Sequence, residues 1–375
     1  MDAVLRSVKR VCYAGLDSVT LRREVVARVE RAVPFDATAF STCDPDTGFM
    51  SHTIHDRVPA PVAKLFVERL YPHVCAWIAV DLPRKGVPVF SMLEQSQQAR
   101  SELRALGVSD QVHVALAADG RLWGSWCLLR LGDSPVTTDR DRALLRRLVP
   151  HITRGLQTAA LIDEGLARSR DRHDDAAPGV LVLDARSRPV VRTPLAAAWL
   201  DDLADVGLRL ADDLPLCVLA LVTQLRRARA DVPAEVRVRV RGRSGRWYVL
   251  RASLAEPDAA GTSAVVVVLR PAVPREMATI LTSLYDLSER EREVVAAVAR
   301  GEPTKAIAAA LGLSPYTVTE HIERACRKIG VRGRKALIAK LFFDGYAPFL
   351  RSERPVMRAT GVPIDSARPA EARSA

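Results

Sequence analysis

The chain has 375 residues, of which 48% are hydrophobic, 26% are charged and 5% are aromatic. This balance is typical of a globular chain that buries apolar cores, and it excludes a mainly disordered protein. The longest apolar runs, such as Ala264–Leu269, are far shorter than the roughly 18–20 residues of a membrane span, so we expect no membrane partner.

The charge balance is basic, with 55 Lys and Arg against 44 Asp and Glu, a formal net charge of +11. This excess is compatible with a polyanion partner, but its location along the chain matters more than its size. No apolar segment follows the charged start of the chain, so we expect no signal peptide. The cysteines lie far apart without a CxxC pair, which favours reduced thiols in the cytoplasm over a disulfide framework or a zinc ribbon. They are Cys12, Cys43, Cys75, Cys127, Cys217 and Cys326.

The chain opens with a helical pattern, predicted over residues 1–33. Apolar side chains recur there every fourth residue, at Leu21, Val25, Val29 and Val33. The following segment VPFDATAF, residues 33–40, predicts the entry to a strand. The sequence DPDTG at 44–48 is rich in turn-forming residues, so a hairpin is expected to follow.

A second hairpin and a long helix complete the first part of the chain, residues 1–168. Two apolar stretches flank Asp119-Gly120, a pair typical of tight hairpin turns. A helical pattern then runs from about Thr137 to about Arg170. This α+β order of elements resembles a GAF sensor domain. The apolar positions of the long helix are Leu144, Leu148, Ile152, Leu156, Ala159 and Leu161.

The first part of the chain contains two weak candidates for a binding site. Trp77, Trp123 and Trp126 could line a small-molecule pocket, although tryptophans at strand positions more often belong to a core. A metal or haem site would need ligands from His52, His55, His73 and Cys75. On a strand His52 and His55 face opposite sides, so we expect no metal, and the sequence indicates no cofactor.

A charged linker is predicted at 169–178, and a second α+β module at 179–272. Apolar strands, a turn and the start of a helix are expected at 179–200. Further strands follow at 234–254 and 263–270, joined by glycine-containing turns. This order resembles a PAS domain. Taken together, we expect two tandem GAF/PAS-like sensor modules.

The segment EVRVRVR alternates valine and arginine. Period two places Val236, Val238 and Val240 on one face of a strand and the arginines on the other. The arginines could form an anion site, but we favour an exposed strand whose charges discourage edge pairing. No glycine-rich loop or helix N-terminus nearby supports an anion site.

The C-terminal segment, predicted as a domain over 280–347, contains three successive helix starts and stops. Ser288 and Glu291 have the spacing of a capping box, and Gly301 suits the end of that helix. A second, short helix begins near Pro303 and ends at Gly312. Ser314 caps the third helix after a turn of three residues, and this pattern predicts a helix-turn-helix.

The third helix separates its faces. Helical periodicity directs one set of residues toward the core: Val318, Ile322, Ala325 and Ile329. The opposite set comprises Tyr316, Glu320, Glu323 and Arg327, with Thr319 on one flank and Thr317, His321, Arg324 and Lys328 on the other. Every charged residue from Arg324 to Lys340 is positive, which suits a phosphate backbone. A helix of this kind can lie in the major groove of DNA.

This segment is similar to the C-terminal DNA-binding domain of LuxR-type transcription regulators. The matching residues are Leu287-Ser288, Arg290-Glu291, Gly301, Lys305, Ile307-Ala308, Leu311, Leu313-Ser314, Thr317-Val318, His321, Lys328, Gly330-Val331 and Arg334. The chain departs from the family at Thr319, commonly Lys, and at Ala306, commonly Glu.

The resemblance implies specific roles. Thr304 and Lys305 would approach phosphate, Thr317, Val318, Thr319 and His321 would lie near DNA, and a fourth helix at about Arg334–Phe343 would support a homodimer. With the outward-facing side chains added, the candidate DNA-binding residues are Thr304, Lys305, Ser314, Tyr316, Thr317, Val318, Thr319, Glu320, His321, Arg324 and Lys328.

The chain is therefore expected to be an α+β protein with two sensor modules, an all-α four-helix LuxR-type helix-turn-helix domain and a disordered tail at 348–375. We expect a cytoplasmic, homodimeric transcription regulator that binds promoter or operator DNA and responds to a small-molecule or protein effector. No catalytic motif was found, so an enzyme is not expected. The alternatives are a signalling scaffold and a sigma-factor-like protein whose C-terminal helices bind protein or core-promoter DNA.

Overall fold

The computed structural model of the chain describes residues 2–71, 74, 86–170, 177–208, 210, 214–227, 235–257, 263–272, 276, 287–299, 301–337, 356–357 and 363–364. The chain forms two compact units. We call residues Met1–Pro271 with Pro355–Ala375 the sheet unit, and Ala272–Arg354 the helical unit. The predicted change from α+β modules to an all-helical segment is confirmed, and each unit is described by itself.

The first sheet of the sheet unit is antiparallel and has five strands in the order β2-β1-β5-β4-β3. The predicted tight turn joins β4 to β5, where Asp119 (φ 51°) and Gly120 (φ 70°) both adopt positive φ. This geometry matches the right-handed twist of the flanking strands, and the two-hairpin prediction is confirmed. The strands are β1 (Ala37–Cys43), β2 (Met50–Asp56), β3 (Val89–Phe90), β4 (Val108–Ala118) and β5 (Arg121–Leu131).

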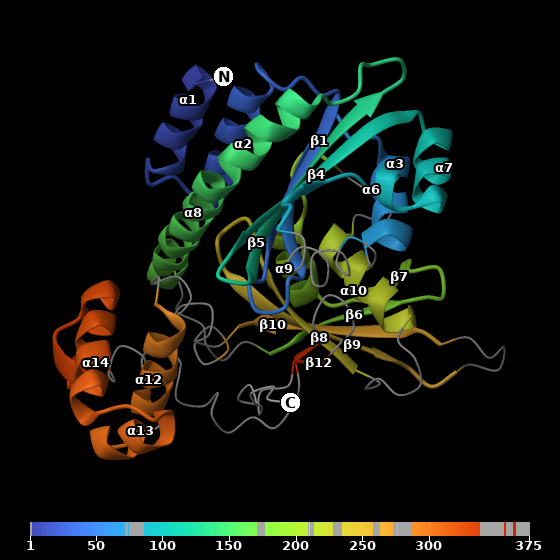
Figure 1. The fold of residues 1–375 in the computed structure, drawn as a ribbon. Helices are drawn as coiled ribbons and strands as arrows, with labels where there is room; N and C mark the ends of the chain where they lie inside the picture. The colour runs from blue at the N-terminus through green and yellow to red at the C-terminus, as the bar shows by residue number, and fades with distance from the viewer. Residues whose placement is uncertain are drawn as a thin grey trace, which may run out of the picture. The chain divides into compact units, whose positions relative to one another are not determined.

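Helices cover both faces of this sheet (Figure 1). One group consists of α1 (Asp2–Cys12), α2 (Ser18–Val29) and the long α8 (Asp139–Arg170). The other group consists of α3 (Ala60–Leu65), the π-helical turn η1 (Phe66–Leu70), α6 (Met92–Gln95) and α7 (Gln97–Ala105). The predicted long exit helix is confirmed, whereas the sequence pattern did not reveal the second group.

The prediction of one helix over residues 1–33 is wrong, because α1 and α2 are separate. Gly15 adopts a φ of 69° in the break between them. The side chain of Asp17 then accepts hydrogen bonds from the backbone N–H groups of Val19 and Thr20, each at 3.0 Å, and so starts α2. The periodic apolar residues are buried as expected, but the N-cap divides the helix before them.

The second sheet has the order β7-β6-β10-β9-β8. When the strands of each sheet are counted along the chain, both sheets follow the same order, 2-1-5-4-3. The predicted strands around 179–200, 234–254 and 263–270 are confirmed. The elements are β6 (Gly179–Leu183), β7 (Pro189–Arg192), α9 (Pro194–Leu203), α10 (Leu216–Arg227), β8 (Glu235–Arg241), β9 (Trp247–Leu254) and β10 (Val265–Pro271).

Helix α10 lies between the two sheets. It contacts η1 and β2 of the first half of the sheet unit, which carries the first sheet (residues 2–170), and β8 and β9 of the second half, which carries the second sheet (residues 177–271) (Figure 1). Phe49, Met50, Val67 and Tyr71 of the first half belong to the same buried cluster as the interior of the second sheet. The two predicted modules therefore share a core and are not packed independently. Of the predicted linker at 169–178, residues 169–170 continue α8, and 171–176 lie outside the described residues.

The preference for an exposed EVRVRVR strand is wrong. The three valines are buried in the core as predicted, but Arg239 and Arg241 on the other face are only 5% and 4% exposed. Arg239 bonds to Asp44 at 2.8 Å and to Asp46 at 2.5 Å, both in the β1–β2 turn. Arg241 pairs with Asp163 of α8. Carboxylates of the chain itself neutralise these arginines. Because these carboxylates belong to sequence-distant segments that pack on the strand, the strand is shielded from solvent.

The helical unit contains α12 (Glu289–Ala299), α13 (Thr304–Leu311), α14 (Pro315–Ile329) and a helical segment at 333–337. Residues 338–347 of the predicted fourth helix and domain lie outside the described residues. Within the predicted tail, β11 (Val356–Met357) pairs with β12 (Pro363–Ile364), and the remaining tail residues lie outside the described set. No helix in the described ranges is long and apolar enough to span a membrane.

Candidate nucleic-acid interface

The helix boundaries of the helical unit are set by local hydrogen bonds. The backbone N–H of Ser288 donates to the carboxylate of Glu291 at 2.8 Å, and the N–H of Glu291 donates to the Ser288 hydroxyl at 3.2 Å. This reciprocal pair is the predicted capping box. Gly301, Gly312 and Gly330 end the three helices with φ of 83°, 64° and 76°, values that glycine adopts without steric cost.

The turn between α13 and α14 is short and fully hydrogen-bonded. The N–H of Leu313 donates to the carbonyl of Ala308 at 2.9 Å, which closes the end of α13. The Ser314 hydroxyl accepts the N–H of Thr317 at 3.0 Å and caps α14, and Pro315 occupies the first helical position. The predicted helix-turn-helix is confirmed as a geometry. Ser314 and Thr317, both predicted interface residues, have structural roles at this helix start.

Helix α14 has one buried and one exposed face. Val318, Ile322, Ala325 and Ile329 are buried in a cluster with residues of α12 and α13, as predicted. The inclusion of Val318 among the DNA-binding residues needs correction, because its side chain is 0% exposed and faces this core. Val318 holds the helix against its neighbours and has no free surface for a base or a phosphate.

The exposed face of α14 combines an aromatic side chain with polar and charged ones. Tyr316 is 74% exposed. Thr319 is exposed, and its hydroxyl donates to the carbonyl of Pro315 at 3.0 Å. Glu320 is half-buried, and its carboxylate lies 3.4 Å from the guanidinium of Arg324 in a solvent-exposed pair. Such pairs contribute little to stability, so both groups can exchange partners at low cost.

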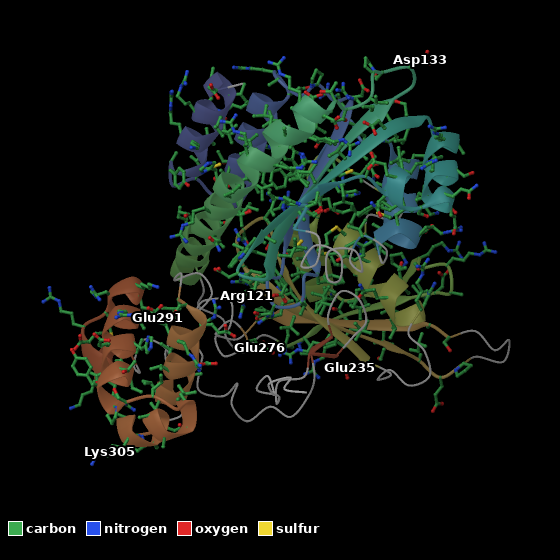
Figure 2. All side chains as sticks on the ribbon, in the orientation of Figure 1. Arg121, Asp133, Glu235, Glu276, Glu291 and Lys305 are labelled. Carbon is green, nitrogen blue, oxygen red and sulfur yellow. The ribbon has the colours of Figure 1, made fainter. Side chains whose placement is uncertain are left out.

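Two exposed residues of this face, Glu323 and Arg327, had no assigned role in the sequence analysis. Helical periodicity places them on the same side as Tyr316, and this signal was sufficient to include them. On α13, Lys305 is exposed and projects outward from the helix (Figure 2). The exposed polar and aromatic side chains of α13 and α14 thus comprise Lys305, Tyr316, Thr319, Glu323, Arg324, Arg327 and Lys328.

Lys328 is exposed, and its ammonium is engaged in an ion pair with α12. Its Nζ lies 2.7 Å from Oε2 of Glu291, the capping-box residue of α12, whose side chain is buried. Burial alone would raise the pKa of Glu291, but the hydrogen bonds from Lys328 and Ser288 outweigh it and lower the pKa. Lys328 therefore joins α14 to α12, and its predicted phosphate contact stays a prediction.

Arg334 joins the segment 333–337 to the start of α13. Its guanidinium donates to the hydroxyl of Thr304 at 3.3 Å and to the carbonyl of Glu302. The Thr304 oxygen is therefore an acceptor within the unit. His321 is half-buried, and its Nδ1 has no hydrogen-bond partner within the described part of the chain. Neither residue is placed as openly as Lys305.

The weak candidates of the sheet unit do not form a site. Trp126 is fully buried, stacks on Phe40 at a centroid distance of 5.1 Å and donates from Nε1 to Thr38 at 2.8 Å. Trp123 is also buried, so both belong to the core. Trp77 lies outside the described residues.

The candidate metal ligands do not come together either. The ring of His52 is hydrogen-bonded to the guanidinium of Arg22 of α2. His55 lies three residues further along β2 and faces the opposite side of the strand, as predicted. The described residues contain no group of His, Cys, Asp and Glu that could hold a metal ion. His73 and Cys75 lie outside the described residues.

Comparison with known proteins assigns the helical unit. The family profile described as "Bacterial regulatory proteins, luxR family" matches residues 286–341. The spore germination protein GerE of Bacillus subtilis is 42% identical over 59 residues, which are 16% of this chain and 80% of that protein. The probable transcriptional regulatory protein NarL of Mycobacterium tuberculosis is 46% identical over 54 residues, 14% of this chain and 25% of that protein. The chain thus spans about a quarter of the NarL length.

Comparison of structures adds little for the sheet unit. The crystal structure of Escherichia coli SdiA covers 90% of this chain and 94% of its own, at 11% identity and a TM-score of 0.30. A GAF domain/HD domain protein from Geobacter sulfurreducens covers 37% of this chain and 91% of its own, at 16% identity and a TM-score of 0.29. Likenesses this weak carry no argument about the ligands of the sheet unit.

Proposed function

This chain belongs to the luxR family of bacterial regulatory proteins, and from this premise we propose that it binds double-stranded DNA through α14 and regulates transcription. The observation that carries the proposal is the division of α14 into a fully packed face and an exposed face. The exposed face bears Tyr316, Thr319 and Arg327, and Lys305 is exposed in the first turn of α13. A rigid helix with this division can enter the major groove without loss of its own core.

The contacts divide by chemistry. Lys305, Arg324 and Arg327 supply positive charge for phosphates, which fix the position of a protein on the duplex. Tyr316 and Thr319 offer a hydroxyl and apolar atoms, which suit base edges and the thymine methyl group. Thr319 takes the place of a residue that is commonly Lys in the family, so base preference rests more on short-range contacts and less on charge.

The sheet unit would act as the sensor. We place its effector, a small molecule or a protein, on the described sheets and propose a cytoplasmic homodimer as the DNA-bound form. The shared core of the two sheets supports this role, because a change in one half is transmitted to the other through α10. Effector-linked DNA affinity would then be a coupling between two equilibria of one chain.

The proposal is tested by titrating the full chain against genomic DNA fragments over a range of salt concentrations. We expect the logarithm of the affinity to fall linearly with the logarithm of salt, since each neutralised phosphate contributes a slope of about −0.9. Lys305→Ala and Arg327→Ala should each reduce the slope by roughly one unit. Fragments that do not bind at low salt would overturn the proposal.

Lys328→Met is the matched control. It removes a positive charge from the same helix as Arg327, but this charge is already paired with Glu291. We therefore expect little change of the salt slope, together with a modest loss of stability of the helical unit. An equal slope change in all three variants would mean that net charge, and not the exposed face of α14, determines binding.

A further inference from the structure

A pocket of ≈ 260 Å³ opens in the second half of the sheet unit, beside α9 and at the border of the buried cluster between the sheets. Its apolar wall consists of Leu200 on α9 and of Leu208, Leu210 and Leu214 in the segment that leads to α10. Typical ligand pockets enclose roughly 300–1,000 Å³, so an occupant must be smaller than a drug-sized molecule.

The charged lining of the pocket leaves one arginine open. Arg243 donates to the backbone carbonyl of Asp201 at 2.7 Å, and its guanidinium lies 3.4 Å from the Asp201 carboxylate. The guanidinium of Arg192, at the end of β7, has no hydrogen bond or ion pair with any residue that the structure describes. It is exposed at the pocket, where its charge can meet an anion.

Asp205, the other acid of the lining, is already used. One carboxylate oxygen accepts the N–H of Thr53 at 3.2 Å, and the other accepts the N–H of Leu216 at 2.7 Å. Burial raises the pKa of Asp205 to about 7, so its negative charge is reduced near neutral pH. Among the lining residues that the structure describes, the pocket therefore has an apolar wall and one unpaired cation.

The wall that carries Arg243 is fixed before any ligand arrives. The carbonyl of Asp202, at the end of α9, accepts the N–H of Arg243 at 2.8 Å, and its carboxylate accepts the Tyr248 hydroxyl at 2.8 Å. A Cβ at Gly242 would lie 2.2 Å from this carboxylate. The β8–β9 turn and α9 are thus locked together, and a preformed site loses little entropy on binding.

The opposite wall connects the two sheets. The N–H of Val206 donates to the carbonyl of Thr53 at 3.0 Å, and the N–H of His55 donates to the carbonyl of Val206 at 2.7 Å. Residue 206 thereby adds a parallel bridge to the edge of the first sheet at Ile54. A ligand on Leu208 would touch the segment that joins the second half of the unit to β2.

We propose that this pocket binds a small organic monocarboxylate with an apolar body, with the carboxylate on Arg192 and the body against Leu200, Leu208 and Leu214. One unpaired guanidinium matches one carboxylate, and the nearby Asp201 disfavours a dianion such as a phosphate ester. The ligand would stabilise the segment 204–208 in its position on β2. This site is separate from the DNA-binding face and needs no assumption about it.

The test uses the full chain and three probes with one six-carbon body, namely hexanoate, hexanol and hexylamine, measured by saturation-transfer NMR and calorimetry. Hexanoate should bind most tightly and hexylamine least. Arg192→Gln should weaken hexanoate binding about tenfold and leave hexanol unchanged, because only the charged contact is lost. Arg186→Gln is the matched control, because Arg186 is an exposed arginine of the β6–β7 turn outside the pocket lining.

Three results would overturn the proposal: no saturable hexanoate binding at millimolar concentration, hexylamine binding as tight as hexanoate, or equal affinity of the Arg192→Gln variant. Leu208→Ser provides a second variant, and it should weaken hexanoate and hexanol alike. Since no DNA is present, failure here leaves the proposed regulator function untouched, and failure of DNA binding leaves this site untouched.

Discussion

The two sheets of the sheet unit have the same strand order but different interiors. The second sheet encloses an apolar cluster that includes Leu181, Leu250 and Val267. The first sheet buries many polar side chains, and several of their atoms have no partner within the described residues, such as Nδ1 of His113 and both ring nitrogens of His55. The strand order therefore does not dictate the chemistry of the interior, which depends on what packs against each face.

The positions of the charged residues explain part of this contrast between the two interiors. Arg239 and Arg241 lie on the outer face of the second sheet, yet they are buried because the first half covers them. These two arginines thus lie outside the apolar core of the second sheet but are still buried within the sheet unit. The junction between the halves is polar around Arg239 and apolar around α10, and these two parts can be broken separately.

The largest effect is expected for Arg239→Ala. Removal of the guanidinium leaves the buried Asp44 carboxylate without its ion-pair partner and takes one partner from Asp46. Such a loss costs about 3–5 kcal/mol. The two carboxylates raise the pKa of Arg239 against the opposing effect of burial, so the group is charged at every pH of interest. Unfolding in denaturant can be followed by tryptophan fluorescence, since all five tryptophans lie in the sheet unit: Trp77, Trp123, Trp126, Trp199 and Trp247.

Arg188→Ala is the control for this variant. Arg188 lies in the connection between β6 and β7 and pairs with Asp184 at 2.8 Å, but both side chains reach solvent. An exposed pair is worth about 0–1 kcal/mol, so the midpoint should hardly move. A similar loss in both variants would show that the junction is not the stabilising feature.

A smaller effect is expected for Gly207→Ala, which tests the bridge between the sheets. Gly207 has a φ of +81°, and a Cβ there would lie 2.1 Å from the backbone carbonyl oxygen of His55. Strain from the positive φ and displacement of the bridge together should cost roughly 2–4 kcal/mol. Gly120 has a similar φ of +70°, but open space surrounds a methyl group added there. Gly120→Ala should therefore lower the free energy of unfolding by only about 1 kcal/mol.

If the two glycine variants lose equal stability, the contact between residue 207 and β2 contributes nothing beyond backbone strain. Hydrogen exchange adds a local measurement. Faster exchange of the His55 amide in Gly207→Ala than in Gly120→Ala is expected, because this amide donates to Val206.

The helical unit could be predicted from sequence because its signals are local. Ser288 and Glu291, Gly312 and Ser314 determine helix ends through bonds that span at most a few residues. The buried face of α14 follows from periodicity alone. What the sequence could not show is the partner of Lys328, since Glu291 lies 37 residues away and only the packing of α12 on α14 brings it near.

The sheet unit was less predictable for the same reason. Alternation placed the valines of β8 correctly, but the burial of Arg239 depends on Asp44, which lies 195 residues away. The sequence pattern did not reveal the helices between β2 and β4 or helix α10. The turn η1 and helix α10 contact each other across the two halves, so their burial depends on a sequence-distant partner. Asp17 has the residue type of an N-cap and could have indicated the division of the first helix. The i+4 spacing of apolar residues instead suggested one continuous helix.

The smallest effect at neutral pH is expected for His113→Phe, which makes the interior of the first sheet resemble that of the second. The His113 ring lies between Phe66 and Phe90 at centroid distances of 5.8 and 5.3 Å, so a phenyl ring fits the same stack. The variant removes the unpaired Nδ1 and the contact of Nε2 with Gln111. These changes oppose one another, and the free energy of unfolding should change by less than about 1 kcal/mol.

The acid limb of the stability curve distinguishes the two proteins. Burial lowers the pKa of His113 from 6.5 to about 4, so the unfolded chain takes up a proton at a higher pH than the folded chain. Its contribution is therefore complete above pH 6.5 and is lost as the pH falls toward 4, by roughly 3 kcal/mol. His113→Phe should be more acid-resistant than the natural chain over this range. Parallel curves would mean that His113 protonates equally in both states and is not enclosed by the sheet and η1.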